Sequence, residues 1–305
     1  MTDIVKALEL FPIFGLLGAA ILGLLVGSFL NVVIYRVPKM MERGFIAECV
    51  SMIGEENLKD TYKKTNSYLN AHSNTAFNLV TPNSTCPCCG HKIKPWENIP
   101  VISYLFLRGK CSACKTRISI RYPIIEVITG LFSLIAIYVF GVNETGLACL
   151  VFTWCLIALT MIDIDTQLLP DSITLPLLWL GLIVNYFGLF TNLPSALWGA
   201  IGGYMSLYSV YWLFKWLTGK EGMGFGDFKL LAALGAWLGW QMLLQIILLS
   251  SLVGAVIGIS MILILGRDKN IPIPFGPYLA IAGWIALMWG QDINQAYISY
   301  AFNHH

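Results

Sequence analysis

Charged side chains are scarce in this sequence. Asp, Glu, Lys and Arg make up 12% of the 305 residues, whereas hydrophobic residues make up 57%. A soluble domain carries about 25% charged residues. The shortage excludes an ordinary soluble domain and predicts an all-α protein that crosses a membrane several times. The net charge of +2 says little about partners, and we expect no nucleic-acid partner.

Several common motifs are absent as well. Residues 1–10 contain no basic n-region and no small-residue cleavage site, so we expect no cleavable signal peptide. No Gly-x-Gly-x-x-Gly follows an expected strand, so no Rossmann-type cofactor site is predicted. The chain also shows no internal repeat, no heptads and no low-complexity tract.

What the chain has instead is a series of apolar runs separated by short breaks. A run of about 20 apolar residues is long enough to cross a bilayer. At Trp240–Gln241 the break is weak, and two short helices there would also fit a re-entrant pair. We expect about eight transmembrane helices, at roughly 11–37, 123–141, 145–163, 172–190, 194–217, 228–242, 244–265 and 275–291.

These runs divide the chain into three parts. Residues 1–37 hold the first transmembrane helix, residues 38–122 form the only long hydrophilic block, and residues 123–305 form a seven-helix membrane domain. Basic residues concentrate on the cytoplasmic side of membrane proteins. With the hydrophilic block in the cytoplasm, only Lys6 of the 19 basic residues falls on the outer side. This bias predicts both the orientation and the helix count.

Five of the eight cysteines cluster in the hydrophilic block. They form two C-x-x-C pairs with 21 residues between them, and Cys88 is the extra one. Paired C-x-x-C motifs are typical of a tetrahedral zinc site, and disulfides are disfavoured in the cytoplasm. Four thiolates leave no open position, so we expect a structural Zn²⁺ that folds this small cytoplasmic domain. The expected ligands are Cys86, Cys89, Cys111 and Cys114, with His91 as a possible substitute.

A glycine-rich stretch, residues 222–229 (GMGFGDFK), precedes the sixth expected helix and contains Asp227. The expected topology brings the end of the third helix to the same membrane face. Three aspartates there compete as partners of Asp227, namely Asp163, Asp165 and Asp171. Asp163 and Asp165 point about 200° apart on a helix, so only one can face Asp227. Asp163, the deepest, is slightly preferred, and Asp171 suits a helix cap.

Two neighbouring carboxylates share a proton, so one can act as a base on water and the other as an acid. Aspartic proteases use this device. Their soluble members usually carry Asp-Thr-Gly, which is absent here because Gln167 follows Asp165 and Thr166. The alternative class is non-catalytic: a zinc-bearing scaffold, or a cation transporter with intramembrane carboxylates. A transporter would place those carboxylates near the middle of the bilayer and often shows a repeat.

Taken together, these features resemble the type IV prepilin peptidases of pilus and type II secretion systems. The resemblance covers nearly the whole chain. Besides the cysteine pairs, Asp163–Asp171 and Gly224–Asp227, it includes residues 27–36 (GSFLNVVIYR), 121–126 (RYPIIE) and 274–277 (PFGP). So many motifs in the same order are highly specific.

The resemblance implies a membrane aspartic endopeptidase that cleaves prepilin and pseudopilin leaders after Gly. It further implies N-methylation of the new N-terminal residue, usually Phe, with S-adenosylmethionine. The implied catalytic pair is Asp163 and Asp227, and the implied location is the bacterial inner membrane, with the active site and zinc domain on the cytoplasmic side. The residues that hold S-adenosylmethionine and the oligomeric state are not predicted.

Three further interpretations concern residues near these motifs. We expect the glycines of residues 222–226 to let the enzyme backbone approach an extended substrate. Lys229 is interpreted either as a basic anchor at the membrane interface or as a group that biases proton sharing. Glu126 either neutralises Arg121 or Arg36, or takes part in methyl transfer.

Overall fold

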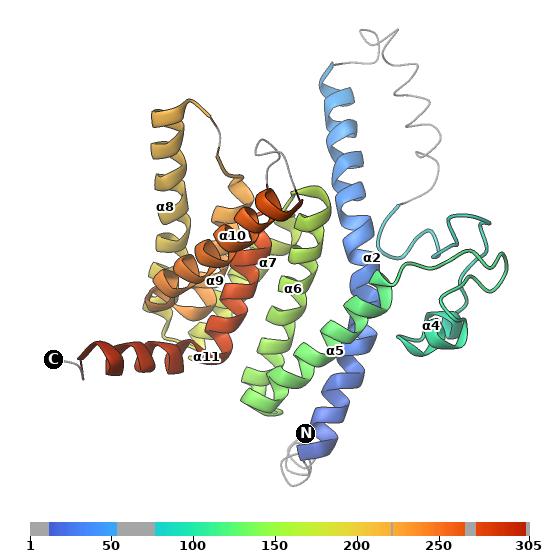
Figure 1. Cartoon of the computed structure of the whole chain (residues 1–305), viewed down its shortest axis with the longest axis horizontal. Helices are drawn as coiled ribbons and strands as arrows, with labels where there is room; N and C mark the ends of the chain where they lie inside the picture. The colour runs from blue at the N-terminus through green and yellow to red at the C-terminus, as the bar shows by residue number, and fades with distance from the viewer. Residues whose placement is uncertain (1–11, 54–76, 221, 266–272, 303–305) are drawn as a thin grey trace. The chain divides into compact units, whose positions relative to one another are not determined.

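The computed structural model describes residues 12–53, 77–220, 222–265 and 273–302 (Figure 1). Within these ranges the regular elements are helical, apart from two isolated β-bridges. Both bridges lie in residues 85–117, which we call the cysteine-rich region. The expected all-α class is confirmed. The long helices are α2 (Pro12–Ile53), α5 (Arg121–Phe140), α6 (Glu144–Thr166), α7 (Asp171–Tyr186), α8 (Leu193–Thr218), α9 (Phe225–Leu238), α10 (Leu243–Leu265) and α11 (Gly276–Phe302). The short ones are η2 (Pro95–Asn98), α4 (Ile102–Phe106) and η3 (Trp240–Met242).

Each expected apolar run coincides with one of the long helices. Four stretches of the described chain are long and apolar enough to cross a membrane, judged by length and composition. They are Pro12–Cys49, Arg121–Phe140, Glu144–Thr166 and Trp240–Met261. The count of eight crossings and the division of the chain at residues 37 and 122 stay predictions. Lys6 and the expected cytoplasmic Arg267 and Lys269 lie outside the described residues.

Helix α2 continues well past the end of its apolar run. The expected span stops near residue 37, whereas the helix runs to Ile53 and contains Pro38. A helix needs an apolar surface only where it contacts lipid or a core, so polarity alone did not mark its end. At the other weak boundary, Gly239 has a φ of 83° and separates α9 from η3 and α10.

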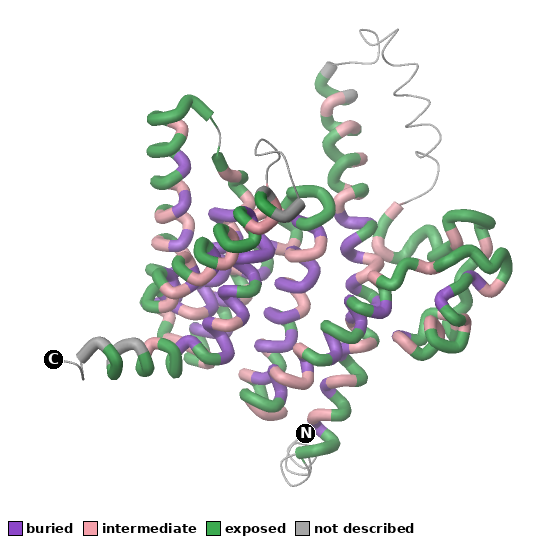
Figure 2. The backbone as a smooth tube through the Cα atoms, in the orientation of Figure 1, coloured by how far each residue is buried: buried purple, intermediate pink, exposed green. Residues whose placement is uncertain are grey.

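The described chain forms two compact units. One contains residues 12–20 and the chain from Leu131 onward, and the other contains residues 21–130. In the first unit α9 is the most deeply buried helix, since most of its side chains from Asp227 to Trp237 are inaccessible to solvent (Figure 2). It packs against α8, α7 and α11. With 14 residues, α9 is about 21 Å long, which is shorter than the ~30 Å core of a bilayer.

The C-terminal end of α9 is held by a buried amide. Asn185, near the end of α7, donates hydrogen bonds to the carbonyls of Ala236 (2.8 Å) and Trp237 (2.9 Å). Its side-chain oxygen accepts from the N–H groups of Phe190 (3.1 Å) and Thr191 (3.0 Å). One side chain therefore satisfies carbonyls at the end of α9 and donors in the turn after α7, all in a buried place where unpaired groups are costly.

Helices α8 and α9 approach each other through glycines. A Cβ added at Gly199 would collide with the backbone carbonyl of Gly235, and one at Gly235 would collide with that of Gly199. A Cβ at Gly203 would lie 2.6 Å from the carbonyl oxygen of Leu231. Small residues at helix crossings allow such backbone contact in membrane proteins. This contact fixes α9 against α8.

In the second unit, polar side chains of α2 and α5 hold the segments between them. Buried Arg36 of α2 donates to the backbone carbonyls of Asn78 (2.8 Å) and Pro82 (2.6 Å). Buried Glu126 of α5 accepts from the backbone N–H of Val101 at 2.8 Å. Among the described residues no ion pair joins Glu126 to Arg36. The predicted neutralisation of Glu126 by Arg36 is therefore replaced by a contact with the backbone.

We predict that Gly199→Ala weakens the packing of α8 on α9. The new methyl group meets rigid backbone, so the free energy of unfolding should fall by about 1–3 kcal/mol. Gly202→Ala is the matched control on the same helix, because its Cβ would meet only a flexible side-chain methyl of Leu243 at 3.3 Å. Thermal unfolding in detergent gives the melting temperature of each variant. Equal melting temperatures for the two variants would contradict the prediction.

Candidate active site and metal centre

Asp163 lies in the last turn of α6 and is 4% exposed. Its carboxylate Oδ2 accepts a hydrogen bond of 3.1 Å from the backbone N–H of Gly276, the first residue of α11. The approach is close, since a Cβ on Gly276 would lie 2.6 Å from the same oxygen. The side chain is thus positioned by a residue 113 positions away in the sequence.

Asp227 lies in the first turn of α9 and is 8% exposed. It interacts electrostatically with Asp163. Leu169, in the connection from α6 to α7, lies between the elements that carry these groups, because it contacts both Gly226 and Gly276. Three connections therefore meet around the two carboxyl groups: those that follow α6, precede α9 and precede α11.

The other two candidate aspartates lie elsewhere. Asp165 is exposed. Asp171 is also exposed, and both of its carboxylate oxygens accept from Lys229 Nζ, at 2.8 Å and 2.7 Å. This ion pair ties the N-terminal part of α9 to the start of α7. Lys229 is accordingly engaged by Asp171, which does not support the interpretation that it biases proton sharing between Asp163 and Asp227.

The glycines of residues 222–226 have different surroundings. A Cβ on Gly222 would lie 2.7 Å from the ring of Phe214, and one on Gly226 would lie 2.8 Å from Leu169. Only at Gly224 is space open, with the nearest atom, Asp227 Oδ2, at 4.0 Å. Packing against Phe214 and Leu169 accounts for the small size of Gly222 and Gly226, and the expectation that these glycines admit substrate stays a prediction.

The buried pair can perform acid–base chemistry. Two carboxyl groups in a site with little water hold a proton between them, so one is ready to accept a proton from water while the other is ready to donate one. Such a pair can add water to an activated carbonyl without a metal ligand. Sequence reasoning found both aspartates but gave Gly276 no role. The only signal for it was its place in the motif at residues 274–277.

The four predicted cysteine ligands form a compact cluster. The sulfur atoms of Cys86, Cys89, Cys111 and Cys114 all lie within 4.8 Å of one another. The Sγ atoms of Cys86 and Cys114 are 3.8 Å apart. Thiolates about 2.3 Å from a central zinc ion are separated by about 3.8 Å along the edges of a tetrahedron. The sulfur positions therefore fit a Zn²⁺ ion, and all four ligand places would be filled.

The two cysteine pairs share one backbone geometry. In each pair the N–H of the first cysteine donates to the carbonyl five residues further on, at 2.9 Å for Cys86 and 2.8 Å for Cys111. The N–H groups of Gly90 and Lys115 then donate back to those cysteines, at 2.9 Å and 3.1 Å. Both residues have positive φ, 71° and 60°. This repeated turn directs the thiols of each pair to one point.

His91 and Cys88 stand outside the cluster. The Nε2 atom of His91 lies 3.1 Å from Glu97 Oε2 and 3.2 Å from Ser112 Oγ. Glu97 also accepts from the N–H of Lys94 at 2.9 Å. The thiol of Cys88 is exposed. His91 is therefore part of a hydrogen-bond network around the cluster and does not replace a cysteine.

Comparisons with known proteins show which family the chain resembles over nearly its whole length. The sequence model of the bacterial peptidase A24 N-terminal domain matches residues 21–140, and that of the type IV leader peptidase family matches residues 150–259. A protein of Pseudomonas aeruginosa named prepilin leader peptidase/N-methyltransferase is 55% identical over 95% of this chain and 96% of its own. A protein of the same name from Stutzerimonas stutzeri is 56% identical over 95% of this chain and 96% of its own. Another from Neisseria gonorrhoeae is 52% identical over 91% of this chain and 92% of its own. No solved structure matches the chain.

We predict that the purified full-length chain contains about one zinc ion and that Cys111→Ser removes most of it. The cysteine-rich region should then become sensitive to protease, because metal binding supplies its folding free energy. Cys88→Ser, an exposed thiol outside the cluster, is the control and should retain the metal. Elemental analysis and limited proteolysis test this, and loss of zinc in both variants would count against the four-cysteine site.

Proposed function

The chain belongs to the family of prepilin leader peptidase/N-methyltransferases, and we propose that it cleaves prepilin leaders with the buried Asp163–Asp227 pair. The enzyme is an inner-membrane protein that removes the leader and methylates the new N-terminus. The observation that carries the site assignment is the meeting of two buried carboxyl groups from α6 and α9 around Leu169. Prepilins and pseudopilins are the proposed substrates, with cleavage after Gly.

The proposed hydrolysis uses one proton on the pair. The ionised carboxylate accepts a proton from water as the oxygen bonds to the scissile carbonyl carbon. The protonated carboxyl group donates its proton toward the peptide, and the tetrahedral intermediate then collapses as the C–N bond breaks and the amine leaves protonated. The products are a leader ending in a Gly carboxylate and a mature chain with a new amino terminus.

Gly276 and Gly224 are proposed to serve this step in different ways. Gly276 holds one oxygen of Asp163 through its N–H group, so that the carboxyl group keeps its orientation. Gly224 is exposed and has open space where a side chain would be. We place the extended cleavage segment of the substrate there, with its apolar helix in the membrane beside α6 and α7. Close approach of two backbones is what a glycine permits.

The second reaction transfers a methyl group to the new terminal amine, usually of Phe, from S-adenosylmethionine. We assign that donor no residues. The cysteine cluster is proposed to hold zinc as a structural ion, since four thiolates leave it no place for substrate. The active site and zinc domain are proposed to face the cytoplasm. No observation favours a scaffold or a cation transporter, because the buried carboxylates lie at helix ends.

We predict that Asp163→Asn and Asp227→Asn each lower kcat/KM for leader cleavage by at least about 10²-fold, because an amide can neither accept nor donate the proton. Methylation of a mature-length substrate and zinc content should be unchanged. Asp165→Asn, an exposed neighbour of Asp163, is the control and should cleave normally. Gel-shift assays with a prepilin in detergent measure the effect, and efficient processing by either active-site variant would refute the assignment.

We also predict that Gly276→Ala lowers kcat for cleavage by about 10²-fold, since its Cβ displaces the Asp163 carboxyl group by a large fraction of an ångström. The KM should change little, because no substrate contact is removed. Gly258→Ala in α10 is the control, as its nearest neighbour would be Ile273 at 3.4 Å. Wild-type kcat in the Gly276 variant would mean that Asp163 does not depend on this contact.

A further inference from the structure

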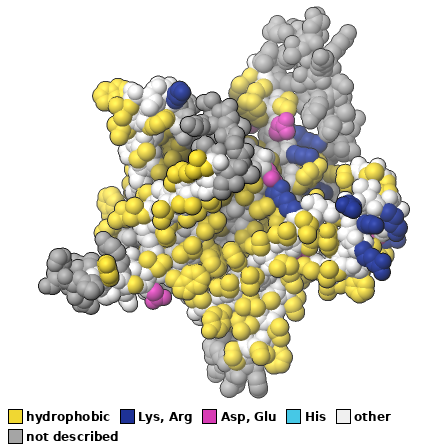
Figure 3. Space-filling model, in the orientation of Figure 1, with side chains coloured by type: hydrophobic (Ala, Val, Ile, Leu, Met, Phe, Trp, Pro, Cys, Tyr) yellow, Lys and Arg dark blue, Asp and Glu magenta, His cyan; other side chains and the backbone are white. Residues whose placement is uncertain are grey.

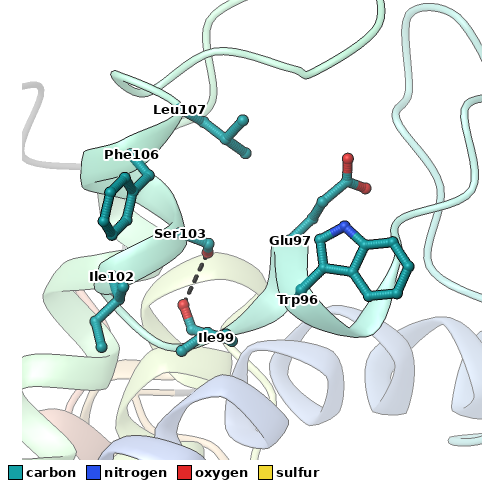
Figure 4. A pocket seen from close by; sticks show the side chains of 7 residues that line it. All are labelled: Trp96, Glu97, Ile99, Ile102, Ser103, Phe106 and Leu107. Carbon is teal, nitrogen blue, oxygen red and sulfur yellow. Dashed lines mark hydrogen bonds between the residues drawn. The ribbon is translucent and has the colours of Figure 1, made fainter.

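A small apolar surface projects from the second unit at residues 95–107, which we call the α4 loop. It contains η2, α4 and the turn between them, and an open pocket of ≈ 330 Å³ lies among its side chains (Figure 4). Phe106 is 84% exposed and Leu105 is 68% exposed. Ile102 and Phe106 project from the same side of α4 (Figure 4). Exposed groups of large apolar side chains mark contact surfaces.

The contacts between α2 and α5 show which residues of the two helices lie side by side, and therefore where along them the α4 loop is attached. Asn31 of α2 donates to the carbonyl of Tyr122 in α5 at 3.2 Å. One turn earlier in α2, a Cβ on Gly27 would lie 2.7 Å from Cα of Glu126. The two helices therefore run antiparallel here, with Gly27 level with Glu126.

The α4 loop is attached at that same level. The backbone N–H of Val101, which directly precedes α4, donates to Glu126 at 2.8 Å. Gly27 is nine residues before Arg36, which corresponds to about 13 Å along the helix. Arg36 binds the segment that contains Val80. Val101 is thus attached, through Glu126, to a level of α2 that lies about 13 Å deeper in its apolar part than Arg36 does.

Many backbone N–H groups in α4 and in the turns beside it are hydrogen-bonded within the protein. Val101 has a φ of 59°, which is unusual for a β-branched residue, and its N–H is satisfied by the Glu126 side chain. The N–H groups of residues 102, 103, 105 and 107 to 110 all donate to nearby carbonyls. The Ser103 hydroxyl donates to the carbonyl of Ile99 at 2.8 Å (Figure 4). In lipid, an unsatisfied backbone group is strongly unfavourable because no water is present to bind it.

Basic side chains lie next to the apolar ones. Lys94 Nζ lies over the ring of Trp96, 5.3 Å from its centroid, and Arg108 and Lys110 follow the loop. Figure 3 shows Lys and Arg gathered on one part of the cysteine-rich region and hydrophobic side chains on another. The one acidic residue of the α4 loop, Glu97, forms a hydrogen bond with the ring of His91. Tryptophan with flanking basic residues is typical of a membrane interface with anionic lipids.

We propose that the α4 loop inserts into the lipid leaflet on the side of the cysteine-rich region, with Leu105 and Phe106 among the acyl chains. Trp96 lies at the headgroup level, and Lys94 reaches the lipid phosphates. Interfacial segments of this kind bury their apolar side about 5–10 Å into the boundary of headgroups and acyl chains. The inference depends on α2 and α5 crossing the membrane and not on the proposed catalytic function.

The test places one fluorescent amino acid at Phe106 or at Val80 of the full-length chain, with one chain in each lipid nanodisc. Val80 is the matched control, because it is an apolar side chain of the same unit and is 80% exposed. Unlike Phe106, it belongs to the segment that Arg36 binds. Quenching is measured with phospholipids brominated on the acyl chains and with aqueous iodide. Leu105 serves as a second site, and zinc content together with leader cleavage verifies folding.

The expected result is strong quenching by brominated lipid at positions 106 and 105, with iodide quenching several-fold weaker than at position 80. Efficient iodide quenching at 106 would place the loop in water and overturn the proposal. Protection from both quenchers would also overturn it, because protein would then cover the loop. With one chain per disc and no substrate present, a second copy or a bound prepilin cannot imitate the expected result.

Discussion

The close packing of α9 is the constraint on which the first unit, which contains the chain from Leu131 onward, depends. This helix is too short to behave as an ordinary crossing, and nearly all of its side chains are inside the protein. It is held by backbone contact with α8 through Gly199 and Gly235 and by its neighbours α7 and α11. Because small residues bring the helix axes so close, there is little freedom for α9 to slide or rotate. Its first turn therefore presents Asp227 at one defined place.

The second carboxyl group is fixed by a different device. Asp163 lies at the end of a long helix and is oriented from outside by the N–H group of Gly276. The end of α6 and the starts of α9 and α11 meet at this point, and each brings one part of the site. Both carboxyl groups are buried, and electrostatic interactions between groups in such surroundings are stronger than in water. The arrangement keeps reactive groups together while other charged side chains nearby, such as Lys229 and Asp171, are paired with each other.

Much of this could be predicted from the sequence, for physical reasons. Apolar runs predicted the helices because lipid and core both require apolar surface, and C-x-x-C spacing predicted the sulfur cluster because the ligands are local in the chain. Topology brought Asp227 to the same membrane face as three candidate aspartates, and the resemblance to prepilin peptidases then selected Asp163 among them. Contacts between distant backbone groups leave no such pattern, so the roles of Gly276 and Val101 were not predicted. The same holds for Gly222 and Gly226, whose small size serves packing against Phe214 and Leu169.

The amide of Asn185 gives α9 the mechanical character of a short rod clamped at both ends. One clamp is the ion pair of Lys229 with Asp171 beside the carboxyl groups, and the other is the set of four hydrogen bonds around Asn185. These two sets of contacts hold opposite ends of a helix about 21 Å long. The turn around Asn185 therefore helps to determine where the first turn of α9 places Asp227, although it lies at the opposite end of that helix.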